Sequence, residues 1–154
     1  MLRASVFIAI LSSLVLAPAA GAVIQLDRAI SGARIGNTKA EVRTALGKPR
    51  RVIKAQGEFG PTTEFRYRGG LRVVFLSGRV TLASTTGLGD RTSRGVGVGS
   101  SEARVTSRVP GVTCETFEGT RICSRGAEQP GDRGTFFFVD DGKVTRVDVA
   151  LVID

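Results

Sequence analysis

The sequence of 154 residues contains no histidine, the most versatile acid–base side chain near neutral pH. Ser-His-Asp and Cys-His nucleophile systems are therefore excluded. Asp140 and Asp141 are adjacent acids, but Gly142 follows them and the three residues are typical of a tight turn. A paired-carboxylate hydrolase needs two acids at a controlled separation. We expect no enzyme activity, and an enzyme of unrecognised type is the least favoured alternative.

No motif in the chain predicts a bound cofactor, metal or nucleic acid. The glycine-rich stretch 95–99 lacks the Lys-Ser/Thr of a phosphate-binding loop, and we interpret it as a flexible link. Two cysteines without histidine do not make a zinc site. The Arg-Gly-Gly triplet at 68–70 occurs once and is interpreted as a turn between strands. We therefore expect no cofactor, no metal and no nucleic-acid partner.

The two cysteines bracket a predicted β-hairpin. A two-residue turn at Glu118-Gly119 places Cys114 opposite Cys123 in a non-hydrogen-bonded pair. The Cα atoms of such a pair lie about 4.5 Å apart, within disulfide range. The spacing predicts a disulfide bond, and two reduced thiols in the core are the alternative.

The loop 126–134 follows this hairpin and is the main candidate for binding a partner, because a disulfide would hold one of its ends. It displays Glu128, Asp132 and Arg133, and a loop in the first half of the chain displays Phe59. We predict these four residues as partner contacts. The alternative is that both loops are ordinary polar turns.

The first 22 residues have the order of a secretory signal. Arg3 precedes an apolar run, Pro18 ends the run, and Ala20-Gly21-Ala22 fits a small-x-small cleavage site. The run is shorter than the roughly 20 apolar residues that span a membrane. We predict cleavage near Ala22 and a secreted or extracytoplasmic protein, with no later transmembrane segment. A buried N-terminal strand or helix is the alternative.

The net charge of +8 favours acidic partners, anionic envelope polymers or membrane surfaces. The basic residues are scattered along the chain rather than gathered in one run. The charge therefore has a second interpretation as a contribution to solubility.

The chain contains an internal repeat. Residues 35–47 align with 98–110, and residues 72–80 align with 136–144 in the same order. We predict a first unit at 23–86, a glycine-rich connection at 87–99 and a second unit at 100–154.

Each unit is predicted to open with a short helix, capped by Thr38 or Ser101, with Thr38 and Glu41 forming a capping box. Four strands then follow in each unit. The predicted strands are 50–56, 63–68, 71–76, 79–85, 112–117, 120–124, 134–140 and 143–152. The predicted fold class is α+β, as two tandem units with helices packed on one face of an antiparallel sheet.

The pattern at 35–49, Ile-Gly-x-Thr-x-x-Glu-Val-x-x-x-Leu-Gly-x-Pro, resembles a helical segment shared by two groups of proteins. These are the outer-membrane assembly lipoproteins of the SmpA/OmlA type and the β-lactamase inhibitory proteins. The tandem arrangement is closer to the inhibitory proteins. That resemblance implies that Asp132 takes the place of an aspartate that enters the active site of a class A β-lactamase.

These observations favour an exported, non-catalytic protein-binding module, either inhibitor-like or an envelope-assembly factor. Its expected partner is another extracytoplasmic protein. The alternative is a structural cell-envelope protein that binds anionic wall polymer through its arginines.

Overall fold

The computed structural model describes residues 23–153, and the predicted signal segment with its cleavage site lies outside them. The described chain begins with a small sheet of three two-residue strands, β1 (Ile24–Gln25), β2 (Ala29–Ile30) and β3 (Ala33–Arg34). Helix α1 (Lys39–Leu46) follows. The predicted capping box is confirmed, because the Thr38 side chain accepts a hydrogen bond from the Glu41 N–H and the Glu41 carboxylate accepts one from the Thr38 N–H.

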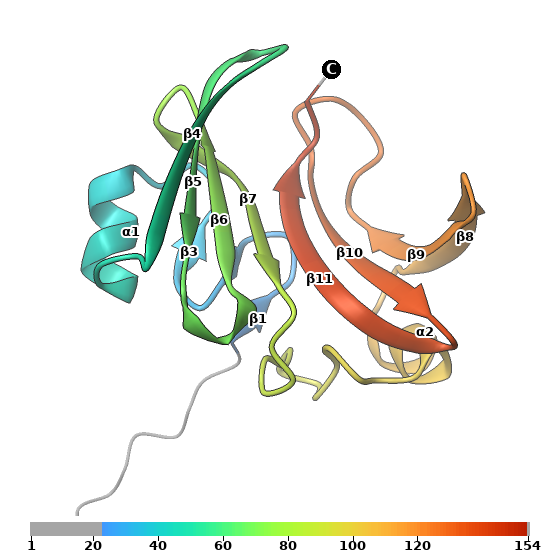
Figure 1. Cartoon of the computed structure of the whole chain (residues 1–154). Coiled ribbons are helices and arrows are strands. Elements are labelled where there is room, and N and C mark those ends of the chain that lie inside the picture. The colour runs from blue at the N-terminus through green and yellow to red at the C-terminus, as the bar shows by residue number, and fades with distance from the viewer. Residues whose placement is uncertain (1–22, 154) are drawn as a thin grey trace, which may run out of the picture.

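One antiparallel sheet of eight strands forms most of the molecule (Figure 1). Its order is β4-β5-β6-β7-β11-β10-β9-β8. The strands are β4 (Arg51–Gly57), β5 (Gly60–Arg66), β6 (Arg72–Leu76), β7 (Arg79–Thr85), β8 (Thr113–Phe117), β9 (Thr120–Arg125), β10 (Arg133–Asp140) and β11 (Lys143–Leu151). A short 3-10 helix, η1 (Arg68–Gly70), joins β5 to β6, and α2 (Glu102–Arg108) precedes β8. All eight predicted strands are confirmed, with ends that differ by at most three residues.

The predicted α+β fold, with two units whose helices pack on one face of a sheet, is wrong. The protein is mostly β, and the two sets of four strands form one sheet because their last strands, β7 and β11, pair with each other. Helices of eight and seven residues are too short to make a layer over eight strands. Each helix buries one side chain completely, Val42 in α1 and Val105 in α2.

The two halves of the described chain nevertheless make corresponding contacts. The N–H of Gly36 donates to Val80 O at 2.8 Å, and the N–H of Gly99 donates to Val144 O at 2.6 Å. Each bond ties the segment before a helix to the last strand of its half. The strand register also shifts once in each half, between Val74 and Phe75 and between Phe138 and Val139.

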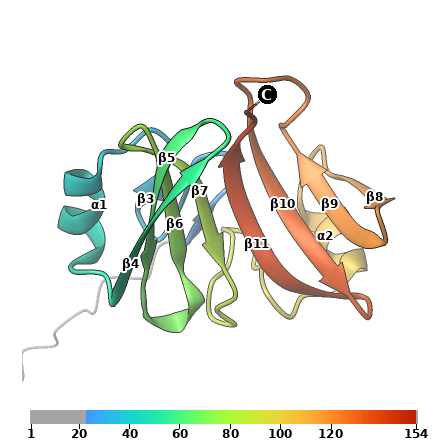
Figure 2. The same cartoon turned by 45° about the horizontal axis from the view of Figure 1, so that its top comes forward.

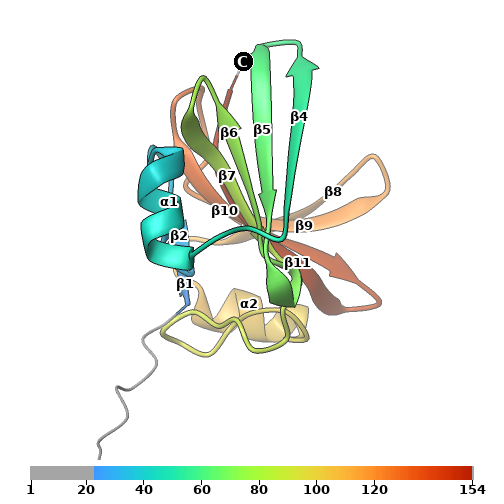
Figure 3. The ribbon, with the colours of Figure 1, turned by 60° about the vertical axis from the view of Figure 1, so that its left-hand side comes forward.

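One face of the sheet is covered mainly by the N-terminal segments and the connection between the halves, and each short helix adds one fully buried side chain. Figure 3 shows β1, β2 and both helices on the same side of the sheet. The buried cluster joins sheet residues such as Phe65, Val73 and Phe137 to residues of the covering segments. The covering residues are Ile24, Ile30, Ile35, Val42, Val96, Val98 and Val105.

The prediction that 95–99 is a flexible link is also wrong. Val96 is fully buried and Val98 nearly so. Gly97, between them, lies against the backbone of the same connection, where an added Cβ would meet the Asp90 carbonyl oxygen at 2.0 Å. The glycines therefore let the connection pack closely, so that its two valines join the core.

The predicted hairpin register is confirmed, with Cys114 opposite Cys123, a Cα–Cα distance of 3.9 Å and a disulfide bond. Glu118 and Gly119 in the turn both have positive φ, as a two-residue hairpin turn requires. Within residues 23–153, no helix is long and apolar enough to cross a membrane.

Candidate functional site

The second face of the sheet is open. Strand alternation directs Glu64, Arg72, Ser84, Asp148 and Phe136 to this face, opposite to the buried cluster. In Figure 2 no helix crosses in front of β6, β7, β11 or β10. The face carries an apolar groove at one end and a group of arginines at the other.

The apolar groove, which we name the Phe59 groove, lies at the β4–β5 turn and has a volume of about 340 Å³. Its larger apolar lining residues are Phe59, Val74, Leu76, Leu82, Leu151 and Ile153. The Phe59 side chain is 53% exposed and Ile153 is 41% exposed. Clusters of exposed apolar side chains on a soluble domain are typical of interaction sites, whereas single ones are not.

The loop 126–134 holds the chain end that forms one wall of this groove. The Gly131 N–H donates to Val152 O at 2.9 Å, and the Val152 N–H donates to Asp132 O at 2.8 Å. Val152 lies between Leu151 and Ile153, whose side chains line the groove. The loop therefore positions these two residues without lining the groove itself.

Asp132 uses its carboxylate within its own loop. Its Oδ2 accepts hydrogen bonds from the N–H groups of Gln129, at 2.9 Å, and Glu128, at 3.2 Å. The side chains of Glu128 and Arg133 are exposed. Of the four residues predicted as contacts, Phe59 is the one that lines the groove, and Glu128, Asp132 and Arg133 lie together on the supporting loop.

Sequence reasoning missed the groove's other apolar residues. Val74 and Leu82 sit opposite each other on β6 and β7, with their side chains on the open face. The signal that could have found them is the uninterrupted apolar character of residues 73–76, which exceeds what a strand with one buried face needs.

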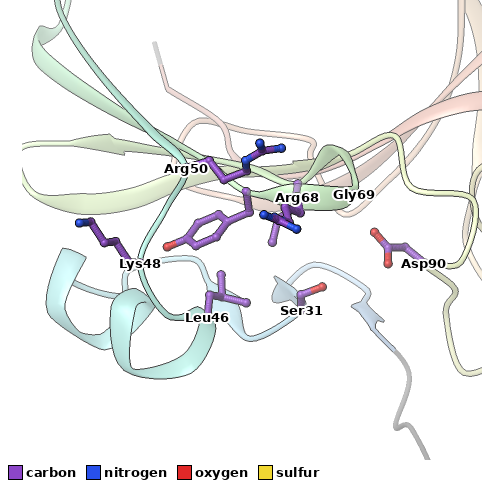
Figure 4. Close-up of a pocket in the computed structure, with 9 residues that line it drawn as sticks. Ser31, Leu46, Lys48, Arg50, Arg68, Gly69 and Asp90 are labelled. Carbon is purple, nitrogen blue, oxygen red and sulfur yellow. The ribbon is translucent and has the colours of Figure 1, made fainter.

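A pocket of about 390 Å³ lies between the end of α1 and η1 (Figure 4). Lys48, Arg50 and Arg68 line it, and Asp90 lies at the opposite end of the view from Lys48. Tyr67 also lines it, and burial raises the pKa of its hydroxyl. Lys48 and Arg50 come from the segment between α1 and β4 and Arg68 from η1, so the fold brings basic residues from two parts of the chain together here.

A polar contact sits where the two halves of the sheet join. The Ser84 hydroxyl of β7 donates to Asp148 Oδ1 of β11 at 2.5 Å, and Arg146 Nε lies 3.1 Å from the same oxygen. Burial raises the pKa of the Asp148 carboxyl, and the hydrogen bond from Ser84 and the charge of Arg146 oppose the rise. The arrangement joins the halves through side chains as well as through the backbone.

One group of potential metal ligands lies in the described chain, namely Glu102, Cys114 and Cys123, with donor atoms within 4.8 Å of one another. Both sulfurs are in the disulfide, and Glu102 forms an ion pair with Arg121 at 2.5 Å. The hydrogen bond from Arg121 lowers the pKa of Glu102. The disulfide and the ion pair therefore stabilise the β8–β9 hairpin and its contact with α2, and they occupy the donor atoms that a metal would need.

No family model matches the chain, and no curated protein matches its sequence. Solved structures share its fold. An uncharacterised protein, yfeY, from Escherichia coli superposes with a TM-score of 0.51 at 15% identity, over 84% of this chain and 98% of that one. A DUF4309 family protein (YjgB) from Bacillus subtilis superposes with a TM-score of 0.52 at 14% identity, over 84% of this chain and 88% of that one.

An extracellular protein with an SCP domain from Bacillus anthracis gives a TM-score of 0.54 at 10% identity. The match covers 75% of this chain but 43% of that longer one. At these identities the three structures establish the fold alone. None of their names belongs to the outer-membrane assembly lipoproteins or the β-lactamase inhibitory proteins.

Proposed function

We propose that the protein is an exported, non-catalytic module that binds another extracytoplasmic protein through the Phe59 groove. The observation that carries this proposal is the position of Phe59, half exposed at the rim of a groove lined by apolar side chains from three strands and the chain end. Aromatic residues are enriched among the side chains that dominate binding energy. The complementary partner presents an apolar side chain that fills the groove beside Phe59.

Two further features support this proposal. The Cys114–Cys123 disulfide fits an oxidising compartment outside the cytoplasm, as does the signal-like order of the first 22 residues. The groove wall at 151–153 is fastened by the backbone of the 126–134 loop, so the site is largely formed before binding. Preformed sites lose less conformational entropy on association.

The resemblance to the β-lactamase inhibitory proteins is part of this proposal, since it also implies a protein partner. For Asp132 we propose a different role from the one that the resemblance implies. Its carboxylate holds the loop that positions Leu151 and Ile153, so we propose that Asp132 acts on binding through the groove wall rather than by contact.

The test is capture from the envelope and secreted fraction of the source cell by the purified protein with its disulfide intact. We compare Phe59→Ala with Phe117→Ala, because Phe117 is 63% exposed at the tip of the β8–β9 hairpin, away from the groove. Loss of one partner with Phe59→Ala, at low and high salt, and its retention with Phe117→Ala would support the groove. Equal binding by both variants and the unmodified protein would exclude it.

The variant Asp132→Ala distinguishes a direct contact between Asp132 and the partner from an effect of Asp132 on the position of residues 151–153. If Asp132 acts through the loop, this variant weakens binding and also increases backbone hydrogen exchange at 151–153. Weaker binding with unchanged exchange would instead indicate a direct contact. Retention only at low salt, by polymer rather than protein, would favour the wall-polymer alternative.

A further inference from the structure

Three arginines stand directly opposite one another at the other end of the open face. Arg51 of β4 pairs with Arg66 of β5, which pairs with Arg72 of β6. We name them the arginine row. Neighbouring strands lie about 4.8 Å apart, so the row spans roughly 10 Å at its base. Like charges directly opposite on adjacent strands are destabilising, so the row requires compensation from other groups.

A fourth arginine faces the row across a pocket of about 380 Å³. Arg66, Arg72 and Arg146 line this pocket together with the hydroxyl residues Ser84 and Thr86. The Arg146 guanidinium lies over the Phe138 ring, 3.6 Å from its centre, in a cation–π contact. Its buried Nε lies 3.1 Å from Asp148 Oδ1 in an ion pair, but it makes no well-aligned hydrogen bond among the described residues.

The carboxylates nearby do not balance these charges. Glu64 pairs with Arg66 and lies 3.7 Å from Arg72, so one acid serves two arginines. Asp148 pairs with Arg146 and is the second acid of the group. The group therefore contains four arginines and two carboxylates, and it keeps an excess of positive charge.

The basic surface continues past η1. The pocket of Figure 4, with Lys48, Arg50 and Arg68, shares the lining residues Tyr67 and Leu71 with the arginine pocket. Arg50 directly precedes Arg51, and its N–H donates to Arg66 O at 2.8 Å. Seven cations, from the segment before β4 and from β4, β5, η1, β6 and β11, thus form a strip around one end of the sheet.

We propose that the arginine row binds a linear chain of phosphate groups. Guanidinium groups donate paired hydrogen bonds to phosphate oxygens, and a repeating anion matches a row of cations better than a single ion does. The Thr86 hydroxyl lines the same pocket and offers an additional hydrogen bond, whereas the Ser84 hydroxyl already donates its proton to Asp148. This site is separate from the Phe59 groove and does not depend on the proposed protein partner.

The test measures binding of inorganic polyphosphate to the protein by titration calorimetry at two salt concentrations. We expect Arg66→Gln to weaken binding about tenfold, as for the loss of a charged hydrogen bond, and Arg51→Gln with Arg66→Gln to weaken it further. Lys54→Gln is the matched control, because Lys54 lies on β4 with its side chain on the opposite face from Arg51. We expect a change of less than about twofold for this variant.

Three outcomes of these binding measurements would overturn the proposal. Equal weakening by Lys54→Gln and Arg66→Gln would show that net charge alone binds the polymer. Equal binding of polyglutamate would remove the preference for phosphate. Tighter binding to vesicles of anionic phospholipid, dependent on the same arginines, would identify a membrane surface instead. Because the variants could alter folding, shifts of the Arg51, Arg66 and Arg72 side-chain N–H resonances on adding polyphosphate to the unmodified protein give an independent readout, and unshifted resonances would also overturn it.

Discussion

Asp27, in the turn between β1 and β2, joins Arg125 of β9 through a contact of 2.9 Å between Asp27 Oδ2 and Arg125 Nε. The Thr135 hydroxyl of β10 donates to Asp27 Oδ1 at 2.8 Å and accepts from the Asp27 N–H at 2.7 Å. The first turn of the described chain is therefore fastened to strands near its other end. Together with the β7–β11 pairing, these contacts make the two halves one structural unit.

Replacing Asp27 with alanine should destabilise both halves together. Asp27 has a φ of 60°, so Asp27→Asn is the matched control, because asparagine tolerates this conformation. We expect Asp27→Ala to cost about 2 kcal/mol, the scale for charged hydrogen bonds lost at a half-buried site, and Asp27→Asn to cost less. Urea unfolding with hydrogen exchange in β5 and β10 checks this. Faster exchange confined to one half would contradict the coupling.

Removing the disulfide should weaken the β8–β9 hairpin. The bond closes a short loop, since the two cysteines are separated by 9 positions, and its loss should cost about 2–3 kcal/mol by the chain-entropy estimate. The measurement is urea unfolding of the oxidised protein and of the variant with both cysteines changed to serine. Because Glu102 and Arg121 still link α2 to β9, we expect the hairpin to fray rather than detach. Unchanged stability would show that this ion pair and the strand pairing suffice.

Gly97 should tolerate no side chain. A Cβ there would meet the Asp90 carbonyl oxygen at 2.0 Å. If the backbone of the connection moved to relieve this clash, it would draw the buried Val96 and Val98 out of the core. We expect Gly97→Ala to cost about 1–3 kcal/mol, the scale of overpacking. Gly89→Ala in the same connection is the control, because nothing lies within 4 Å of its added Cβ. The measurement is thermal unfolding of both variants. Equal stability of Gly97→Ala and Gly89→Ala would mean that the connection moves freely and would contradict the prediction.

The Asp148 carboxyl should make the protein less stable as the pH rises. Burial raises its folded pKa above the ordinary value of 3.8, so between these two values the folded state binds more protons than the unfolded state. Stability from this group is therefore greatest below pH 3.8 and is lost as the pH rises through the folded pKa. Asp148→Asn keeps the acceptor for Ser84 and removes the titration, so its stability relative to the unmodified protein should increase from pH 4 to pH 7. A difference that does not change with pH in urea unfolding would contradict this prediction.

Local features could be derived from the sequence because each depends on residues close in the chain. The Glu118-Gly119 turn sets the register that brings Cys114 and Cys123 together, and the Thr38–Glu41 capping box marks the start of α1. The strand positions follow from alternation and turn residues for the same reason. Phe59 could be selected as a candidate because an aromatic residue within a polar turn has no local role.

The tertiary structure decided how these elements combine. Pairing of β7 with β11 turns two sets of strands into one sheet. That pairing joins residues 62 to 68 positions apart, and no local sequence pattern predicts it. The same long-range pairing creates the open face, places Val74 and Leu82 beside residues 150–153, and brings Arg146 to the arginine row. The sequence by itself therefore determined the elements, the turns and the disulfide. Which faces are covered, and which distant side chains meet, depended on the docking of strands, which is governed by burial of a shared core rather than by local conformational preference.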